Sequence, residues 1–199
     1  MSVKKIIVST LVLCIITLVA GLSLAAVYEI TKEPIAKAEA QAALNAYYAV
    51  FPEAESFEEL ALKDFNAESG ATVEKVVLAK DSENTLGYAL TVTSPNGYGG
   101  NVTIAMGVIP DGTLKGISVI AQGETAGLGA KCKDNKFTSQ FAGIAGGKVD
   151  YTKSEPLADN QIQAISGATI TTSAVVEAVN AGLDYIAQHE AVAGEGDPT

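Results

Sequence analysis

The sequence predicts an α+β protein: a single N-terminal transmembrane helix followed by an extracytoplasmic antiparallel-sheet domain with flanking helices. Three observations predict this fold class. Residues 6–27 contain no charged side chain. Four later segments are rich in Val, Ile and Thr, which favour strands, and short turns separate them. A final periodic run of apolar residues indicates a helix with one buried face.

The chain divides into three expected regions. Residues 1–50 form a transmembrane anchor helix and its outward extension, residues 51–192 form the extracytoplasmic domain, and residues 193–199 form a disordered tail. The helix should continue beyond the membrane because residues 30–50 are rich in Ala, Glu, Lys and Gln, which are strong helix formers. A kink is expected at Pro34.

The apolar segment has the length of one bilayer core. At 1.5 Å per residue, residues 6–27 span about 33 Å. Lys4 and Lys5 precede the segment and Glu29 follows it. The positive-inside rule therefore places the N-terminus in the cytoplasm and the following domain outside.

A cleaved signal peptide is the alternative interpretation of the same segment. Ser23 and Ala25 are small residues at the −3 and −1 positions of a cleavage site. The apolar run is longer than the usual core of a signal peptide, which favours an uncleaved anchor.

Four strands are expected after an acidic connection. Phe51-Pro52 should end the first helix, and residues 53–70 should form a short helix and a loop. Pro110-Asp111-Gly112 is a hairpin turn, since Pro fixes φ and Gly accepts a positive φ. Consecutive strands with tight turns favour an antiparallel sheet. The expected strands cover residues 73–79, 87–93, 102–109 and 114–121.

The last third of the chain should supply the flanking helices. Residues 132–141 predict a short helix that packs its two phenylalanines, and residues 143–147 predict a loop. Residues 161–165 should return as a strand. Residues 174–188 should form the last helix, whose apolar side carries Val175, Val179, Leu183 and Ile186.

The composition argues against nucleic-acid binding and excludes an arginine-based phosphate site. All 23 acidic residues follow the anchor, so the outer domain is acidic and lacks the basic face that nucleic-acid binding needs. All 13 basic residues are lysines, so no bidentate arginine clamp on a phosphate can exist.

The cysteines and the histidine predict neither a disulfide nor a metal site. Cys14 lies in the anchor and Cys132 in the outer domain, too far apart to be bridged within one chain. Cys14 is most simply a small apolar filler, and a metal ligand shared with other chains is the alternative. His189 should lie at a helix end, where a cation is favoured.

A hydroxyl-rich segment just before the last helix is the main candidate site. Ser166-Gly167-Ala168-Thr169 combines small residues with hydroxyl groups. Helix N–H groups and the positive end of the helix dipole favour an anion at such a position. The alternative is an ordinary helix cap, with Thr172 or Ser173 as the N-cap residue.

Two glycine-rich segments lie upstream. Glu124-Thr125-Ala126-Gly127-Leu128-Gly129 has no regular period, and Gly97-Tyr98-Gly99-Gly100 places an aromatic residue between glycines. With Ser166–Thr169 and Thr171, these segments resemble the S-G-A-T-x-T, E-T-P-G-L-G and G-Y-x-G motifs of the FMN-binding domain family, in the same order. Ala126 replaces the usual Pro. Gln163 replaces a common Asp that belongs to the flavin transferase's recognition sequence.

The resemblance implies a cofactor and its attachment. In that family FMN is bound covalently through a phosphoester on the last Thr of the motif, here Thr169, and a dedicated flavin transferase makes the bond. Ser166, Gly167, Ala168 and Thr171 would shape the phosphate end. No catalytic acid or base and no metal ligand is implied. The residues expected beside the flavin ring are Glu124, Thr125, Gly127, Leu128, Gly129, Tyr98 and Gly99.

Within this family the chain most resembles the G subunits of Rnf complexes, which pass electrons from ferredoxin to NAD and move Na⁺ or H⁺ across the bacterial cytoplasmic membrane. The resemblance implies an electron-relaying flavoprotein subunit that needs other membrane and peripheral subunits and completes no catalysis alone. The C subunits of Na⁺-translocating NADH:quinone reductases share the architecture but are usually longer, and are one alternative. A non-redox extracytoplasmic binding module is an alternative of another class.

Overall fold

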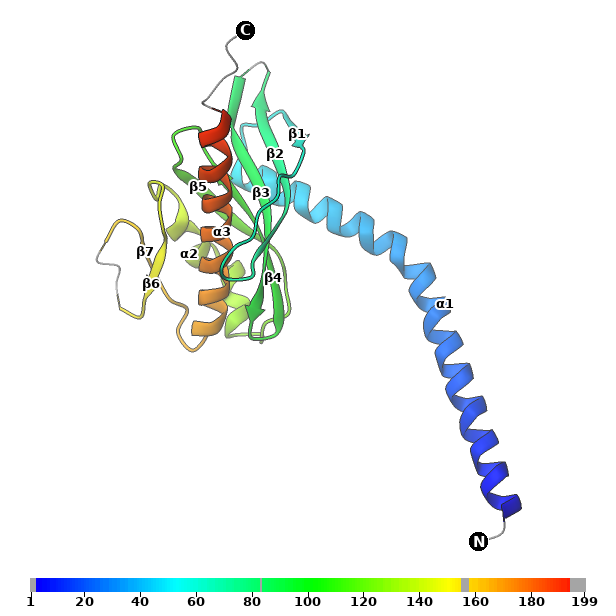
Figure 1. The fold of residues 1–199 in the computed structure, drawn as a ribbon. Helices are drawn as coiled ribbons and strands as arrows, with labels where there is room; N and C mark the ends of the chain where they lie inside the picture. The colour runs from blue at the N-terminus through cyan, green and yellow to red at the C-terminus, as the bar shows by residue number, and fades with distance from the viewer. Residues whose placement is uncertain (1–2, 83, 155–157, 194–199) are drawn as a thin grey trace. The chain divides into compact units, whose positions relative to one another are not determined.

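The computed structural model describes residues 3–82, 84–154 and 158–193 (Figure 1). Its contacts divide the chain into two compact units, Met1–Gln41 and Ala42–Thr199. Most of the tail expected to be disordered, residues 194–199, lies outside the described residues, and Ala193 still belongs to the last helix.

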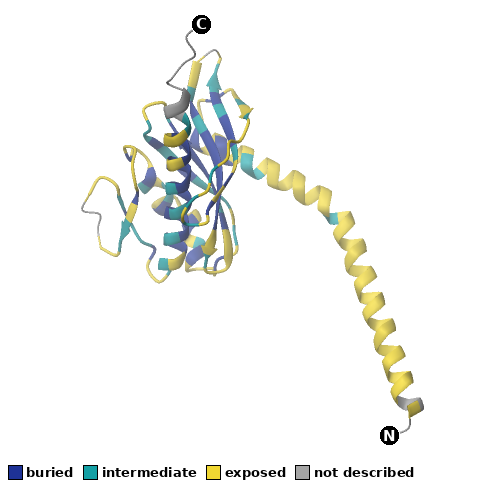
Figure 2. Ribbon diagram, in the orientation of Figure 1, coloured by how far each residue is buried: buried dark blue, intermediate teal, exposed yellow. Residues whose placement is uncertain are grey.

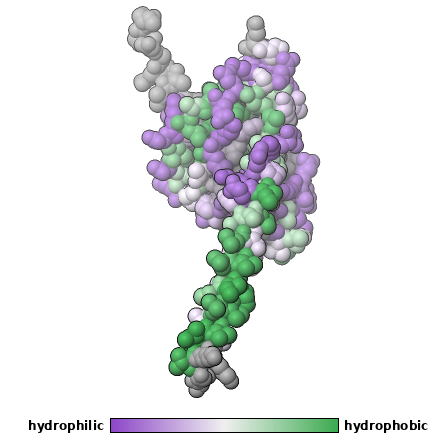
Figure 3. Space-filling view, turned by 90° about the vertical axis from the view of Figure 1, so that its right-hand side faces the viewer, coloured by the Kyte–Doolittle hydropathy of each residue, from purple (hydrophilic) through white to green (hydrophobic). Residues whose placement is uncertain are grey.

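The first helix, α1 (Val3–Val50), continues through Pro34, which confirms the helix expected over residues 30–50. By length and composition α1 is suited to cross a membrane, and its apolar side chains from Ile6 to Val27 are exposed. Apolar residues cover the surface of this N-terminal segment (Figure 3). The kink at Pro34 stays a prediction.

The predicted antiparallel sheet is confirmed. Its five strands follow one another in the order β1-β2-β3-β4-β5, each antiparallel to the next. Hydrogen bonds close the predicted turn between β4 and β5, where the Gly112 N–H donates to the Ile109 carbonyl over 2.9 Å. The strands are β1 (Ser56–Leu60), β2 (Thr72–Asp81), β3 (Asn84–Gly97), β4 (Gly100–Val108) and β5 (Leu114–Gln122).

The strand β1 corrects the prediction of a short helix between residues 53 and 70. Its sequence, SFEEL, has little strand propensity, but all five residues pair with β2, so tertiary pairing outweighs local preference. The half-buried Phe57 contacts the rings of Tyr47 and Tyr48, with ring centroids 5.5 and 4.9 Å away.

Alternating side chains give the sheet two buried faces (Figure 2). One face carries Leu90, Val92, Ile104 and Met106 and packs against the last helix. The other face carries small residues, among them Ala79, Ala89, Ala105 and Gly107, and packs against the C-terminal end of α1. The residues buried there, from the end of α1 and the position just after it, are Ala46, Tyr47, Val50 and Phe51.

The last helix, α3 (Thr169–Ala193), begins five residues earlier than predicted. Its predicted apolar side is confirmed, since Val175, Val179, Leu183 and Ile186 are all buried. Before it, residues 129–141 form three short helical segments rather than one continuous helix, and both predicted phenylalanines are buried there. These segments are the 3-10 helix η1 (Gly129–Lys133), the α-helix α2 (Asn135–Thr138) and the 3-10 helix η2 (Ser139–Phe141).

A two-stranded parallel sheet, β6 (Asp150–Thr152) and β7 (Gln161–Gln163), leads into α3. The sequence predicts β7 but gives no sign of β6. The side chain of Asn180 on α3 binds both backbone groups of Val149, at 2.8 and 2.9 Å, and so fixes the start of β6 against the helix.

Candidate functional site

The hydroxyl-rich segment forms a tight turn between β7 and α3. The Ala168 N–H donates to the Ile165 carbonyl over 3.0 Å, and Gly167 has a φ of 76°, a conformation that favours glycine. The turn brings Thr169 to the first position of α3. The first N–H groups of a helix have no partner within the helix, so Thr169 lies beside donors that can bind an anion.

Thr172 locks this turn from inside the helix. Its Oγ1 accepts a hydrogen bond from the Ile165 N–H at 3.1 Å and donates to the Ala168 carbonyl at 3.0 Å. The alternative that Thr172 or Ser173 is the N-cap residue is therefore wrong, because both lie within the helix. These two bonds compensate the low helix propensity of the Thr-rich start of α3.

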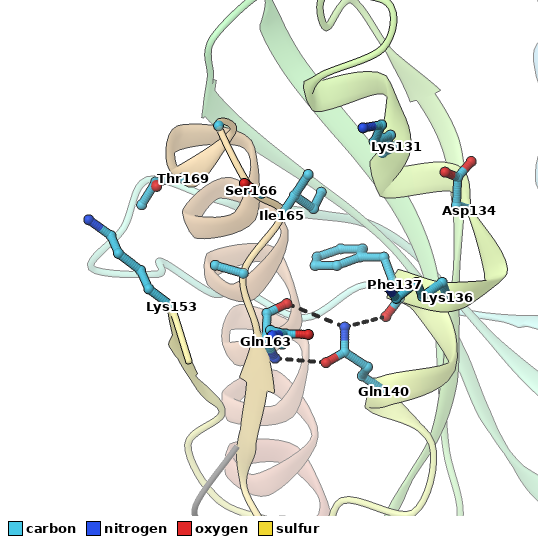
Figure 4. Close-up of a pocket in the computed structure, with 12 residues that line it drawn as sticks. Lys131, Asp134, Lys136, Phe137, Gln140, Lys153, Gln163, Ile165, Ser166 and Thr169 are labelled. Carbon is cyan, nitrogen blue, oxygen red and sulfur yellow. Dashed lines mark hydrogen bonds between the residues drawn. The ribbon is translucent and has the colours of Figure 1, made fainter. Parts of the chain in front are cut away.

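A cleft of about 950 Å³ opens beside the turn (Figure 4). Thr169 and Lys153 lie on one side of the cleft, Lys131 and Asp134 on the other, and the ring of Phe137 lies between them. Three of the predicted site residues line it: Ser166, Gly167 and Thr169. The remaining lining residues are Lys131, Asp134, Lys136, Phe137, Gln140, Lys153, Gln163, Ala164 and Ile165.

The charge of the cleft is opposite to that of the chain. Three lysines and one aspartate line it, whereas the chain has a net charge of −10. Sequence reasoning missed Lys131, Lys136 and Lys153. The signal was the concentration of lysine in residues 131–136 within an acidic domain. Lys153 directly follows β6 and gave no such signal.

Gln140 holds the strand that precedes the turn. Its Oε1 accepts a hydrogen bond from the Gln163 N–H at 2.7 Å, and its Nε2 donates to the Gln163 carbonyl at 3.3 Å (Figure 4). The amide thus pairs with Gln163 as a neighbouring strand would. The Gln163 backbone, whatever its side chain, is fixed at the edge of the cleft.

Glu124 joins the three predicted motifs beneath the turn. Its carboxylate is buried, with 8% of the residue exposed. Oε1 accepts a hydrogen bond from the Gly99 N–H at 2.9 Å, and Oε2 accepts one from the hydroxyl of Thr171. Thr171 is buried, so its hydroxyl faces Glu124 rather than the cleft.

The other predicted residues lie around this core. A Cβ placed on Gly167 would lie 3.4 Å from Leu128 Cδ2, so Leu128 adjoins the turn. Gly129 is buried against Glu124, and Ala168 packs partly on the core. Tyr98, Thr125, Gly127 and Leu128 are exposed and do not line the cleft.

The cysteines and the histidine lie apart from the cleft. Cys132 is fully buried, and burial, with a smaller contribution from the charge of Glu124, raises the pKa of its thiol to about 11. His189 lies within α3 and stacks on Tyr185 at 4.3 Å between ring centroids. Among the described residues no group of three or more metal-ligating side chains exists.

Two family models match the chain. Residues 97–184 match the FMN-binding domain, and residues 1–50 match the RnfG N-terminal region. Over 183 residues the chain is 32% identical to the G subunit of the Na(+)-translocating ferredoxin:NAD(+) oxidoreductase complex of Acetobacterium woodii, covering 87% of each chain. The chain belongs to the RnfG family.

Other members of the family are similar over most of their length. The G subunit of the ion-translocating oxidoreductase complex of Aliivibrio fischeri is 30% identical, over 92% of this chain and 90% of that one. The G subunit of the proton-translocating ferredoxin:NAD(+) oxidoreductase complex of Clostridium ljungdahlii is 29% identical, over 87% and 88%. The match to the RnfG N-terminal region supports the G subunits over the alternative of the C subunits.

Solved structures share the fold of much of this chain. The C subunit of the Na(+)-translocating NADH-quinone reductase of Parabacteroides distasonis is 24% identical, with a TM-score of 0.50 over 57% of this chain and 61% of that one. NqrC of Shewanella oneidensis is 20% identical, with a TM-score of 0.50 over 70% and 73%. The FMN-binding domain match, residues 97–184, contains the three motifs and Glu124.

Proposed function

We propose that this chain is the electron-carrying flavoprotein subunit of a membrane ion-translocating oxidoreductase complex, relaying electrons between ferredoxin and NAD through FMN. The observation that carries the proposal is the position of Thr169. Its hydroxyl lines a large cleft at the N-terminus of α3, inside the segment that matches the FMN-binding domain. Membership of the RnfG family supports the assignment to such a complex.

The residues of the cleft fit a flavin nucleotide. Its volume, about 950 Å³, lies within the range of ligand sites of this size class. The N-terminus of α3 and the three lysines favour a phosphate, while the ring of Phe137 offers an apolar surface. The absence of arginine is compatible with a phosphate held by a covalent bond and by point charges.

The hydroxyl groups near the turn point to Thr169 as the attachment site. The hydroxyls of Thr171 and Thr172 are occupied in hydrogen bonds below the turn. Only Ser166 and Thr169 among the hydroxyl residues of the motif line the cleft. Thr169 matches the esterified position of the family motif, so we assign it the phosphoester bond to FMN and assign the bond's formation to a flavin transferase.

FMN, when bound, supplies the redox chemistry, and the chain supplies position and charge. The turn presents the Thr169 hydroxyl, Gly167 lets the backbone approach the phosphate, and the lysines offset its charge. A single apolar helix offers no path for an ion, so translocation belongs to other subunits. Lys4 and Lys5 favour a cytoplasmic N-terminus and an outer flavin domain.

The test is flavin fluorescence of the denatured full-length chain, made together with a flavin transferase. Covalent flavin survives denaturation, whereas non-covalent FMN and an empty cleft leave a dark band. We expect Thr169→Ala to abolish the fluorescence and Thr169→Ser to retain part of it. Ser166→Ala, which removes the neighbouring hydroxyl of the same cleft, should still give a fluorescent band, because the ester bond is assigned to Thr169.

Two outcomes would contradict the proposal. A fluorescent Thr169→Ala band would exclude the attachment site. A dark wild-type band together with no flavin in the native protein would favour the non-redox binding module.

A further inference from the structure

The carboxylate of Glu124 connects segments that are far apart in the sequence. It accepts hydrogen bonds from Gly99 in the β3–β4 hairpin and from Thr171 in the first turn of α3, 25 and 47 residues away. The backbone N–H of Glu124 in turn donates to the side chain of Gln122, at the end of β5. One buried side chain therefore ties the sheet to the segment that carries Thr169.

Glycines enclose this carboxylate so closely that no side chain fits in their place. A Cβ on Gly97 would lie 2.8 Å from Oε1, and a Cβ on Gly129 would lie 2.6 Å from Oε2 and 2.5 Å from the Thr171 Oγ1. A Cβ on Gly99 would overlap the Gly123 carbonyl. The glycines of two predicted motifs thus serve the packing around Glu124.

The contact with Thr171 determines where Thr169 points. Successive residues of an α-helix are rotated by about 100°, so two residues lie about 200° apart around the axis. Thr171 faces inward to Glu124 and is buried, and Thr169 therefore faces outward and lines the cleft. Holding Thr171 fixes both the rotation and the height of the first turn of α3.

We propose that Glu124 is a positioning residue for flavin attachment, acting through Thr171 to present the Thr169 hydroxyl to the cleft. The carboxylate itself does not line the cleft. The effect on flavin attachment rests on the proposed function, since the presented hydroxyl is the one assigned to the flavin. The link that Glu124 makes between Gly99 in the hairpin and Thr171 in α3 can be tested without flavin.

The first experiment measures the rate of flavin attachment to the full-length chain. Glu124→Ala should lower the rate at least tenfold, and Thr171→Val should lower it by a similar factor. Glu124→Gln should remain within about threefold of wild type, because its amide can accept from Gly99 and donate to the Thr171 hydroxyl. The double variant Glu124→Ala/Thr171→Val should take up flavin at nearly the same rate as either single variant, because both changes remove the same contact.

A control separates positioning from general loss of stability. Val77 is buried on the opposite face of the sheet, against the end of α1. Val77→Ala lowers the melting temperature without touching the turn, so it should accept flavin at the wild-type rate while folded. Equal rates for Glu124→Ala and wild type, or an equally slow Val77→Ala, would overturn the proposal.

The second experiment uses hydrogen exchange in unlabelled protein. Glu124→Ala should raise exchange both in residues 97–100 and in residues 169–173, and Val77→Ala should raise it in neither. Unchanged protection in these two segments would overturn the proposal even if attachment slows. If the wild-type chain takes up no flavin but Glu124→Ala still raises exchange in both segments, the proposed attachment is wrong and the structural link through Glu124 is upheld.

Discussion

Cys132 illustrates how burial dominates the behaviour of one residue. It is fully buried among apolar side chains, and burial raises the pKa of its thiol from 9.0 to about 11. We expect a Cys14→Ala chain, which keeps this single thiol, to react with iodoacetamide at pH 8 on the order of 100-fold more slowly when folded than in denaturant. Mass spectrometry of samples taken over time measures both rates.

The same shift makes stability depend on pH. The folded state retains the thiol proton longer than the unfolded state does, so the stabilising contribution is complete below about pH 9 and is lost as the pH rises toward 11. Cys132→Ala should make the fall in stability between pH 9 and pH 11 shallower, and the buried Tyr47, whose pKa is also raised by burial, should account for part of what is left. Denaturant midpoints at several pH values test it, and an unchanged slope in Cys132→Ala would assign the dependence to other groups.

Ala126 occupies a position where proline should be more stable. The Leu128 N–H donates to the Thr125 carbonyl over 3.2 Å, and Gly127 has a φ of 79°, which together indicate a type II turn with Ala126 at its second position. We expect Ala126→Pro to stabilise the fold by about 0.4–1 kcal/mol, because proline restricts the unfolded chain. Thermal denaturation measures the change.

The matched control is Ala130→Pro, four residues later. The Ala130 N–H donates to the same Thr125 carbonyl over 3.2 Å, and proline would remove that donor. This variant should be less stable than wild type. Stabilisation by both prolines, or by neither, would show that the turn has been misassigned.

The sequence predicted the residues of the site unevenly. Ser166, Gly167 and Thr169 were found because they form one continuous motif, and all three line the cleft. Lys153 was not found, because it reaches the cleft only through the pairing of β6 with β7. The inward direction of Glu124 likewise depends on contacts with residues 25 and 47 positions away.

At the scale of elements, strong local patterns were predicted well and weak ones poorly. The four Val-, Ile- and Thr-rich strands appear with boundaries shifted by a few residues at most, since their alternation matches the two faces of the sheet. The edge strand β1 is short and acidic, and only its pairing with β2 makes it a strand. The start of α3 was missed because threonines disfavour helix interiors when their hydroxyls lack partners.

The helix α1 is divided between the two compact units, and its last residues belong to the C-terminal unit. Residues 42–50 lie in the C-terminal compact unit, and Phe51 just beyond them is fully buried. We propose that a chain starting at residue 42 folds alone and that a chain starting at residue 52 does not. Loss of Phe51 by itself costs about 3–5 kcal/mol, a large part of the stability of a typical domain.

Circular dichroism melts and size-exclusion chromatography test this boundary. A chain starting at residue 28 is the matched control, since the added residues bury almost nothing. It should melt at the temperature of the chain starting at residue 42. Cooperative folding of residues 52–199 would show that the end of α1 is dispensable, and aggregation of all three chains would show that the domain requires lipid.

At the scale of the whole molecule, the proposed orientation separates the flavin from the cytoplasm. The bilayer core is about 30 Å thick, so electrons must pass through a centre held by other subunits. Cys14 is exposed on α1, and the described residues contain no metal-ligating group around it. We therefore expect Cys14→Ala to leave electron transfer nearly unchanged and Thr169→Ala to stop it.

The measurement is ferredoxin-driven reduction of NAD by purified complexes that carry each change, with the composition of each complex checked by gel. Loss of activity in an intact Cys14→Ala complex would assign the thiol to a metal centre shared between chains. Retained activity in Thr169→Ala would remove the flavin of this chain from the electron path.

The hydroxyl that we propose as the flavin acceptor, that of Thr169, lies in the last helix of the chain. In our proposal its orientation depends on the hydrogen bond between Thr171 and Glu124. An unfinished or partly folded chain contains Thr169 only as a flexible residue, with no cleft beside it. We therefore expect attached flavin to serve as a record of maturation: in a population of molecules, the yellow fraction counts those that completed the fold. If only subunits that carry flavin are assembled, each copy of this subunit is checked for complete folding before it enters the complex.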